Sequence, residues 1–262
     1  MILWHFPPKN LTLLKDQVHI WRAELDLPTD LLTDLAVNLS LDERLRAERF
    51  YFERDQKKFI ACRGLLRIIL SRYLDLEPHQ LEFKYSLQGK PELNNNNNTQ
   101  ERLCFNVSHS QGLAVYAIAL NRSVGIDLEY LRHIPDVEQL AERFFSPNEF
   151  RIINALPKQQ QQERFFRFWT IKEAYLKATG EGLAGLQKIA VSFTPENSIN
   201  LQNTETNLFL NTDWFCTEFK PGLEYTGALV VEGKDLGENA IAKCGSSDIT
   251  YFSLKTNYIM NY

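Results

Sequence analysis

Hydrophobic and polar residues alternate along this chain with two periods, one typical of strands and one typical of helices. Short apolar or alternating runs bounded by turn residues predict strands at residues 18–25, 103–107, 113–120, 124–129, 189–193, 213–219 and 226–231. Apolar residues at helical spacing predict helices between residues 29 and 75, and a long helix over residues 162–179 that ends at Gly180. Because helices and strands are intermixed without regular βαβ alternation, the pattern favours an α+β fold.

The composition indicates a globular protein with a substantial core. Of the 262 residues, 44% are hydrophobic and 24% are charged, and the net charge of −4 argues against general attraction to nucleic acid. The sequence has no apolar run of 18 residues, which argues against a transmembrane helix. The start MILWHFPPKN has no signal-peptide pattern, so we expect a cytoplasmic protein with no membrane contact.

Two polar tracts and the cysteines carry no predicted chemistry. Residues 94–98 are all asparagine and residues 159–162 are all glutamine. We expect both tracts to be exposed loops, because neither can form a packed core. The four cysteines show no CxxC spacing, which favours reduced, structural thiols.

A pair of acidic residues occupies one face of an expected strand. The apolar residues of the segment VGIDLE share one face, so Asp127 and Glu129 share the other. Same-face neighbours lie about 6.5–7 Å apart by Cα, so two carboxylates can converge on one hard cation such as Mg²⁺. A solvated strand face without a ligand is the alternative, and the pattern taken alone favours that alternative.

The expected long helix carries an apolar stripe that a lysine interrupts. At about 100° per residue, the stripe comprises Phe165, Phe168, Trp169, Tyr175 and Leu176. Lys172 falls inside it, where a lysine must extend to solvent, pair with an anion or incur a desolvation penalty. Glu173 and Lys177 lie at the edge, and an ordinary helix salt bridge would account for that pair but not for Lys172. Because local rules tend to be broken at functional sites, a phosphate-binding role for the lysines gains weight.

Three further segments carry weaker signals. FNVSHS ends a strand and exposes Ser108 and His109 in a turn. Adjacent residues at a strand end point apart, so binding of a phosphate or hydroxyl is favoured over a nucleophilic dyad, and a histidine without a role stays open. Gly89-Lys90-Pro91 is a turn that presents a cation on a stiff backbone. Arg63 and Arg67 lie one turn apart on a helix, where a solvated face is the default interpretation.

Taken in order, these segments resemble the 4′-phosphopantetheinyl transferase superfamily. The residues that carry the resemblance are Gly89-Lys90-Pro91, Asn106-Val107-Ser108-His109-Ser110, Gly125-Ile126-Asp127-Leu128-Glu129 and Trp169-Thr170-Ile171-Lys172-Glu173-Ala174-Tyr175-Leu176-Lys177. The last two segments are specific as a pair, and Phe144–Glu149 resembles the family's region between them. The length resembles the monomeric surfactin-synthetase-activating (Sfp) class rather than the shorter, trimeric holo-acyl-carrier-protein synthase class.

The resemblance implies two similar α/β subdomains related by a pseudo-two-fold axis, each a three-stranded sheet with a long helix. No internal repeat is evident in the sequence. The N-terminal subdomain would span residues 1–123, and the C-terminal subdomain, with the magnesium ligands, residues 124–233. The tail, residues 234–262, has no counterpart in the family pattern, and we expect it either to be disordered or to lie over the C-terminal half.

The resemblance also implies a reaction and its residues. The enzyme, a 4′-phosphopantetheinyl transferase with holo-[acyl-carrier-protein] synthase activity, would transfer 4′-phosphopantetheine from coenzyme A to a serine of an apo acyl, polyketide or peptidyl carrier protein, releasing 3′,5′-ADP. Mg²⁺, or alternatively Mn²⁺, would be held by Asp127, Glu129 and Glu173. Coenzyme A would contact Arg63, Lys90, Pro91, Ser108, His109, Lys172 and Lys177. Glu173, directly or through a bound water, would be the base, and Lys177 would stabilise charge on the leaving phosphate.

Two other function classes stay open on the sequence. Another metal-dependent phosphoryl or nucleotidyl transferase would suit carboxylates beside lysines, although no Walker A loop typical of an NTPase is present in the sequence. A non-catalytic module that docks carrier proteins or coenzyme A is the second alternative, and the full set of carboxylates argues against it. The sequence does not specify which carrier protein or pathway is physiological.

Overall fold

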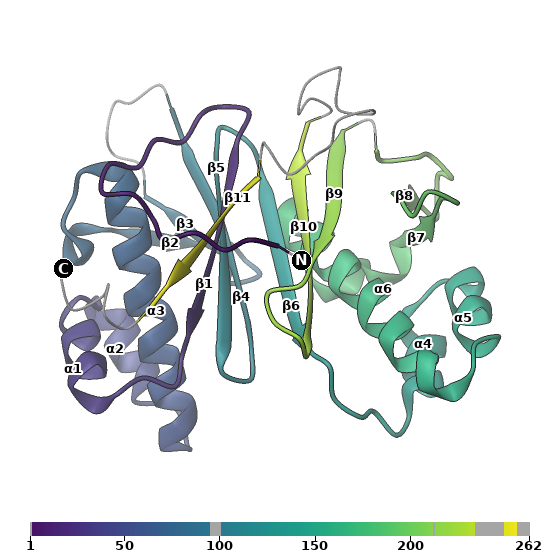
Figure 1. The fold of residues 1–262 in the computed structure, drawn as a ribbon, viewed down its shortest axis with the longest axis horizontal. Helices are drawn as coiled ribbons and strands as arrows, with labels where there is room; N and C mark the ends of the chain where they lie inside the picture. Colours follow the sequence, from purple (N-terminus) through teal and green to yellow (C-terminus); the bar gives the residue numbers. More distant parts are fainter. Residues whose placement is uncertain (1, 95–100, 212, 234–248, 256–262) are drawn as a thin grey trace.

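The computed structural model describes residues 2–94, 101–211, 213–233 and 249–255, so most of the asparagine tract and of the tail lies outside the described residues. Two sheets form the centre of the molecule, and the longer helices lie on their outer sides (Figure 1). The expected α+β fold class is confirmed. Among the described helices, none combines the length and apolar character needed to cross a membrane.

The first sheet is built mainly from the N-terminal half. Its strand order is β11–β1–β5–β4, in which β1 and β11 run parallel and the other neighbours antiparallel. The strands are β1 (Val18–Glu24), β4 (Leu103–Ser110), β5 (Leu113–Leu120) and β11 (Ile249–Leu254). Helix α3 (Glu53–Leu74) packs on this sheet through a core around Trp21, Leu65 and Tyr116. Around α3 lie α1 (Thr29–Val37), α2 (Leu41–Ala47), η1 (Pro78–Gln80) and the hairpin β2 (Phe83–Tyr85) and β3 (Pro91–Leu93).

The second sheet belongs to the C-terminal half. Its strand order is β6–β10–β9, and all neighbours are antiparallel. The strands are β6 (Val124–Tyr130), β9 (Trp214–Phe219) and β10 (Tyr225–Glu232). Helix α6 (Lys158–Thr179) packs on this sheet through a core that includes Ile171, Ala174 and Val230. Around α6 lie α4 (Val137–Phe144), α5 (Pro147–Asn154), η2 (Leu183–Lys188) and the hairpin β7 (Ile189–Phe193) and β8 (Ile199–Asn203).

A third core cluster lies between the two sheets. Strand alternation sends successive side chains to opposite faces, so Ile20 belongs to the cluster between the sheets and Trp21 to the cluster under α3. In the same way, Leu229 lies between the sheets and Val230 lies under α6. The apolar face of β6, including Ile126, fills this middle layer. The opposite face of β6, which carries the acidic residues, is therefore turned toward α6.

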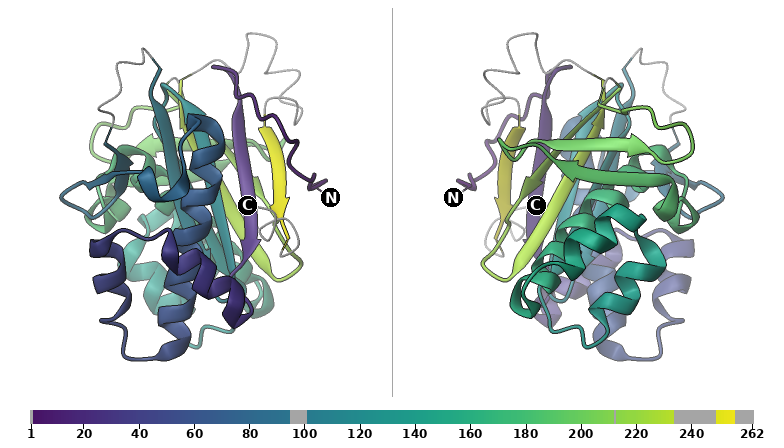
Figure 2. Two further views of the ribbon diagram at one scale, coloured as in Figure 1. Left: turned by 90° about the vertical axis from the view of Figure 1, so that its left-hand side faces the viewer. Right: turned by 90° about the vertical axis from the view of Figure 1, so that its right-hand side faces the viewer.

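The tail contributes a strand to the half of the molecule where it was not expected. Ile249–Leu254 pairs with Val18–Ala23 of β1, and the side views show the two strands next to each other (Figure 2). The expectation that the tail is disordered or lies over the C-terminal half is therefore wrong for this strand. The free edge of β1 offers backbone N–H and C=O groups to a pairing strand, and Phe252 buries its side chain in the core under α3.

The glutamine tract also differs from its prediction as an exposed loop. It lies in the first turns of α6, which begins at Lys158. Gln161 is buried and its Nε2 donates to the backbone O of Leu156 at 3.2 Å, while Gln162 Oε1 accepts from the backbone N of Ile134 at 2.8 Å. Glutamine is a good helix former, and these two bonds anchor the tract where the helix packs on its neighbours, while Gln161 Oε1 is buried with no hydrogen-bond partner among the described residues.

Candidate active site

The acidic strand β6 lies directly beneath helix α6 because Gly125 has no side chain. A Cβ atom at Gly125 would meet the backbone O of Ala174 at 1.9 Å and the backbone N of Ala178 at 2.4 Å. Any larger residue would therefore push the helix away from the strand. The close approach brings Glu173 and Lys177 of α6 over the acidic face of β6.

Three elements meet at Asp127. Lys177 Nζ lies 2.6 Å from Asp127 Oδ1 and donates to Ser108 Oγ at 3.0 Å. Ser108 in turn donates from Oγ to Asp127 Oδ1 at 2.9 Å. The carboxylate is buried, and within the described part of the chain its Oδ2 has no hydrogen-bond partner. The structure thus brings β4, β6 and α6 together around the carboxylate of Asp127, whose Oδ1 accepts the hydrogen bonds from Ser108 and Lys177.

Burial and the nearby charge of Asp127 raise the pKa values of Glu173 and Glu129. Burial, then the charge of Asp127, raises the pKa of Glu173 to about 7, and Lys177 opposes that rise. Burial and Asp127 also raise the pKa of Glu129, although Arg132 lies 3.5 Å away and Ser110 Oγ donates to Glu129 Oε2 at 3.2 Å. Both shifts have the direction that a bound cation would reverse.

The carboxylates do not form a finished metal site as they stand. In the described ranges of the chain, no three His, Cys, Asp or Glu side chains are arranged to hold a metal ion. The donor set nevertheless fits a hard cation: the oxygens come from Asp127, Glu129 and Glu173, and Asp127 Oδ2 is buried with no hydrogen-bond partner among the described residues. In this arrangement the ammonium group of Lys177 is the positive charge that pairs with Asp127.

A cavity of about 250 Å³ opens beside these residues. Lys90, Pro91, Glu173 and Lys177 all line it. The ammonium group of Lys90 donates to the backbone O atoms of Val124, Lys177 and Ala178, and burial lowers its pKa. Lys90 thus fastens the β2–β3 turn to the C-terminal end of α6, where carbonyl groups attract a cation.

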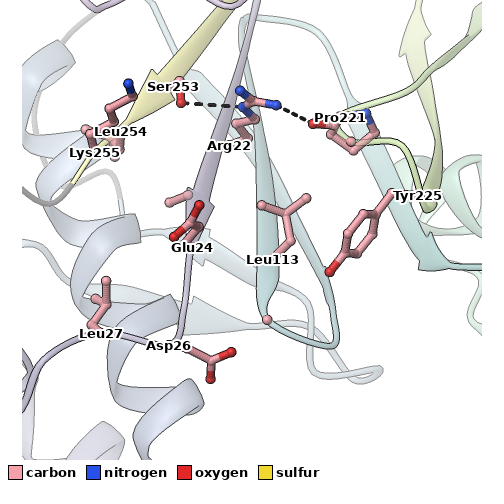
Figure 3. Close-up of a pocket in the computed structure, with 13 residues that line it drawn as sticks. Arg22, Glu24, Asp26, Leu27, Leu113, Pro221, Tyr225, Ser253, Leu254 and Lys255 are labelled. Carbon is pink, nitrogen blue, oxygen red and sulfur yellow. Dashed lines mark hydrogen bonds between the residues drawn. The ribbon is translucent and has the colours of Figure 1, made fainter.

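A larger cavity, of about 680 Å³, lies elsewhere, at the ends of β1, β5 and β10 (Figure 3). Arg22 crosses it, donating to the backbone O of Pro221 and, at 3.4 Å, to Ser253 Oγ. Its lining includes Tyr225 but none of the site residues expected from the sequence. The smaller cavity beside Glu173 is therefore the candidate site.

His109 lies on the opposite face of β4 from Ser108 and is exposed. Partial desolvation, followed by the charges of Lys177 and Lys58, lowers its pKa, which favours the neutral imidazole. Because Ser108 Oγ is engaged by Asp127 and Lys177, the two adjacent residues have separate surroundings.

Lys172 is not part of this site. Its side chain is 0% exposed; Nζ lies 2.7 Å from Glu149 Oε2 and donates to the backbone O of Leu186 at 3.0 Å. The prediction that Lys172 contacts a coenzyme A phosphate is wrong, because no part of its ammonium is open to a ligand. The pattern correctly required an anion for this lysine, but the anion is Glu149.

Arg63 and Arg67 are also buried, so a solvated helix face is the wrong interpretation for both. Glu43 lies between them, with its Oε1 3.1 Å from Arg63 Nε and its Oε2 2.7 Å from Arg67 Nε. Arg63 also donates to the hydroxyl of Tyr85. These partners enclose the guanidinium, so the structure does not bring Arg63 to the acidic cluster as a phosphate contact.

Sequence reasoning missed the roles of Asn106 and Ser110, which support the site, and of Glu149, which pairs with Lys172 outside it. Asn106 and Ser110 flank Ser108 at spacing two, so the period of a strand places all three on one face. Glu149 follows Ser146 by three residues, which is the sequence pattern of a helix capping box. The strand period and the capping-box pattern are both visible in the sequence, but neither identifies which residue of another element these side chains bind.

Comparison with known proteins agrees with this geometry. A family model described as the 4′-phosphopantetheinyl transferase superfamily matches residues 123–229, and one described as 4′-phosphopantetheinyl transferase, N-terminal, matches residues 28–121. A structure of Thermotoga maritima holo-[acyl-carrier-protein] synthase is 25% identical with a TM-score of 0.34, covering 43% of this chain and 64% of that chain. That likeness is too slight to support an inference.

Two curated relatives are more similar in sequence. The 4′-phosphopantetheinyl transferase HetI of a Nostoc species is 47% identical over 230 residues, which are 88% of this chain and 94% of the relative. A putative 4′-phosphopantetheinyl transferase of a Synechocystis species is 38% identical over 171 residues, covering 64% of this chain and 67% of the relative. With a relative of this identity matched over nearly its whole length, and family models matched in both halves, the chain belongs to the 4′-phosphopantetheinyl transferase superfamily.

Proposed function

We propose that this protein transfers the 4′-phosphopantetheine group of coenzyme A to a serine hydroxyl of an apo acyl, polyketide or peptidyl carrier protein and releases 3′,5′-ADP. One observation carries the proposal: the acidic face of β6 lies against Glu173 and Lys177, at the edge of a cavity that Lys90 also lines. Carboxylates beside cations suit a pyrophosphate donor with its metal ion. The names of the relatives support the same reaction.

Asp127, Glu129 and Glu173 are the proposed holders of Mg²⁺, with Mn²⁺ as an alternative. Two observations support this assignment: Asp127 Oδ2 has no hydrogen-bond partner in the part of the chain that the structure describes, and the pKa values of both glutamates are raised. When bound there, the ion would neutralise the pyrophosphate oxygens and help to orient the β-phosphorus. Lys177, which pairs with Asp127 in the free protein, would then be released toward the substrate.

The chain's own side chains would carry the proton and the leaving-group charge. In the metal-free protein the pKa of Glu173 is raised to about 7, and a bound cation would lower it again, so Glu173 would be deprotonated at neutral pH and able to accept a proton, directly or through a bound water. It would accept the proton of the carrier serine as the serine oxygen attacks the β-phosphorus of coenzyme A. The bond from that phosphorus to the bridging oxygen breaks, and Lys177 would stabilise the negative charge on the departing 3′,5′-ADP.

The nucleotide would lie along the turn of Lys90 and Pro91 and the end of β4. Ser108 and His109 are the proposed contacts there, with His109 near the 3′-phosphate. The exposure of His109 and the cavity beside Lys90 support this placement. A neutral imidazole can still donate one hydrogen bond to a phosphate oxygen.

We further propose a cytoplasmic monomer of the Sfp class, with its subdomain boundary between residues 123 and 124. The composition of the site supports this assignment: Ser108 comes from the N-terminal side of that boundary, and Asp127 and Lys177 come from the C-terminal side. One chain therefore supplies residues from both halves to the same carboxylate. Sedimentation of the purified protein would test the oligomeric state.

Intact-mass analysis tests the reaction itself. The protein is incubated with coenzyme A, Mg²⁺ and apo carrier proteins of the acyl and peptidyl types. We expect at least one carrier to gain the mass of one phosphopantetheine group, and the gain to disappear when a chelator removes the metal. No gain with any carrier would overturn the proposal.

A substitution on α6 tests the base. Removing a general base typically lowers kcat about 10²–10⁴-fold, so we expect a loss in this range for Glu173→Gln. The matched control is Glu163→Gln on the same helix, because Glu163 is exposed and pairs only loosely with Lys220, at 3.9 Å. The control should transfer at the native rate. Near-native turnover by Glu173→Gln would show that another group takes the proton.

A further inference from the structure

Side chains of β4 form hydrogen bonds with the backbone of the acidic strand β6 on both sides of its two carboxylates. The strands β4 and β6 lie next to each other but belong to different sheets. Asn106 Oδ1 accepts a hydrogen bond from the backbone N of Ile126 at 2.9 Å, and Ser110 Oγ accepts one from the backbone N of Tyr130 at 3.0 Å. These contacts bracket the segment that holds Asp127 and Glu129.

The same face of β4 also reaches the carboxylates themselves. Ser108 Oγ donates to Asp127 at 2.9 Å and Ser110 Oγ donates to Glu129 at 3.2 Å. Ser110 therefore uses its single hydroxyl twice, as acceptor for a backbone N–H and as donor to a carboxylate. Its two bonds fix both the position of β6 and the direction of the Glu129 side chain.

We propose that Asn106 and Ser110 are positioning residues that preset the proposed metal site, an inference that rests on the proposed function. Carboxylates that bind a metal usually need hydrogen bonds from outside the ligand set to hold their orientation. Here those bonds come from the N-terminal half, whereas all three proposed ligands belong to the C-terminal half. The arrangement couples the placement of the two halves to the affinity for the cation.

A purely adhesive role for this face of β4 makes a different prediction. If Asn106 and Ser110 only held the halves together, their loss would lower the unfolding temperature without changing the affinity of the folded protein for a cation. A positioning role requires that affinity to change. The cation affinity of the folded protein is therefore the deciding measurement.

The test uses Mn²⁺ binding to the full-length protein, measured by electron paramagnetic resonance without coenzyme A or carrier protein. Loss of partners outside the ligand set typically weakens metal binding about 10–100-fold, so we expect a loss in this range for Ser110→Ala and for Asn106→Leu. Ser110→Thr keeps the hydroxyl and should retain most of the affinity. If an alanine or leucine variant does not fold, the near-isosteric Ser110→Cys carries the test, because sulfur is a weak acceptor.

The matched control is Cys104→Ala, two residues before Asn106 on the same face of β4. Cys104 Sγ donates to the backbone O of Arg102, at 3.9 Å, a bond outside β6. This control should bind Mn²⁺ as the native protein does. Native affinity in both Ser110→Ala and Asn106→Leu would overturn the proposal, as would a native protein that does not bind Mn²⁺. Failure of transfer to every carrier, with Mn²⁺ binding intact, would refute the reaction alone.

Discussion

The two halves fasten their long helices with the same kind of buried ionic group but with different cations. In the N-terminal half, Glu43 of α2 lies between Arg63 and Arg67 of α3. In the C-terminal half, Glu149 of α5 pairs with Lys172 of α6 at 2.7 Å. One carboxylate thus faces two guanidinium groups in the first half and one ammonium group in the second.

Each glutamate has a second role that is common to both halves. Glu43 accepts from the backbone N of Ser40 at 3.1 Å, and Glu149 accepts from the backbone N of Ser146 at 2.7 Å. Both are therefore the last residue of a capping box, Ser-x-x-Glu, at the start of a short helix. The pattern recurs in the short helix before each long helix.

The difference in cation predicts the largest contrast between the halves. Glu43→Gln would leave two buried guanidinium groups that cannot lose a proton, so we expect a loss of about 3–5 kcal/mol in the free energy of unfolding. Glu149→Gln should cost less, because Lys172 can become neutral; burial already lowers its pKa. Urea unfolding of both variants at pH 7 measures the two losses.

The pH dependence of the same two variants sharpens the test. In Glu149→Gln, the folded-state pKa of Lys172 should lie below its unfolded value, so the folded state binds fewer protons and its stability rises with pH. We therefore expect Glu149→Gln to regain stability between pH 7 and pH 9, whereas Glu43→Gln should not. Equal losses with parallel pH profiles would show that the choice of cation has no consequence.

The two ionic groups also mark where sequence reasoning succeeded and where it stopped. The strand period placed Asp127 and Glu129 on one face, and the helix period placed Glu173 and Lys177 at one edge, because both patterns depend only on local geometry. The partner of Lys172 lies 23 residues away on another helix, so no local period could name it. The strand β11 shows the same limit, because its pairing with β1 joins opposite ends of the chain.

The next contrast between the halves is the loss of stability at acid pH, which we expect to come from a histidine of the N-terminal half. In the N-terminal half, buried His19 has a pKa lowered to about 4 by desolvation, and its Nδ1 lies 2.8 Å from the Tyr73 hydroxyl. Trp21 Nε1 donates to that hydroxyl, which leaves its proton for Nδ1. His133, the histidine of the C-terminal half, is exposed.

Because the folded pKa of His19 lies below its unfolded value of about 6.5, its stabilisation is complete above pH 6.5 and is lost as the pH falls toward 4. We expect about 3 kcal/mol of pH-dependent stability from this group. Urea unfolding between pH 7 and pH 4.5 should show a shallower acid loss in His19→Gln than in the native protein. His133→Gln, the control, should follow the native profile. Parallel profiles for all three proteins would remove His19 as the source.

Two glycines give the smallest contrast in stability, and it bears most directly on the site. A Cβ at Gly125 of β6 would meet the backbone of α6 at 1.9 Å, whereas a Cβ at Gly64 of α3 would meet Cβ of Leu35 at 2.7 Å. Both α6 and β6 pack against several other elements, so neither can move away from the other easily. Leu35, in contrast, belongs to the short outer helix α1, which can shift more readily. An alanine at position 64 also gains about 1 kcal/mol of helix propensity over glycine.

We therefore expect Gly125→Ala to cost about 1–3 kcal/mol as overpacking typically does, and Gly64→Ala to cost about 1 kcal/mol or less once the gain in helix propensity is included. We expect the two variants to differ more in transfer rate than in the free energy of unfolding. Displacing α6 moves Glu173 and Lys177 relative to Asp127, so Gly125→Ala should lose activity even where it is fully folded, while Gly64→Ala should keep it. Measuring transfer rates at a temperature where both variants are folded decides the matter. Native activity in Gly125→Ala would mean that the carboxylates tolerate a shifted helix, and the close contact between α6 and β6 would then serve packing alone.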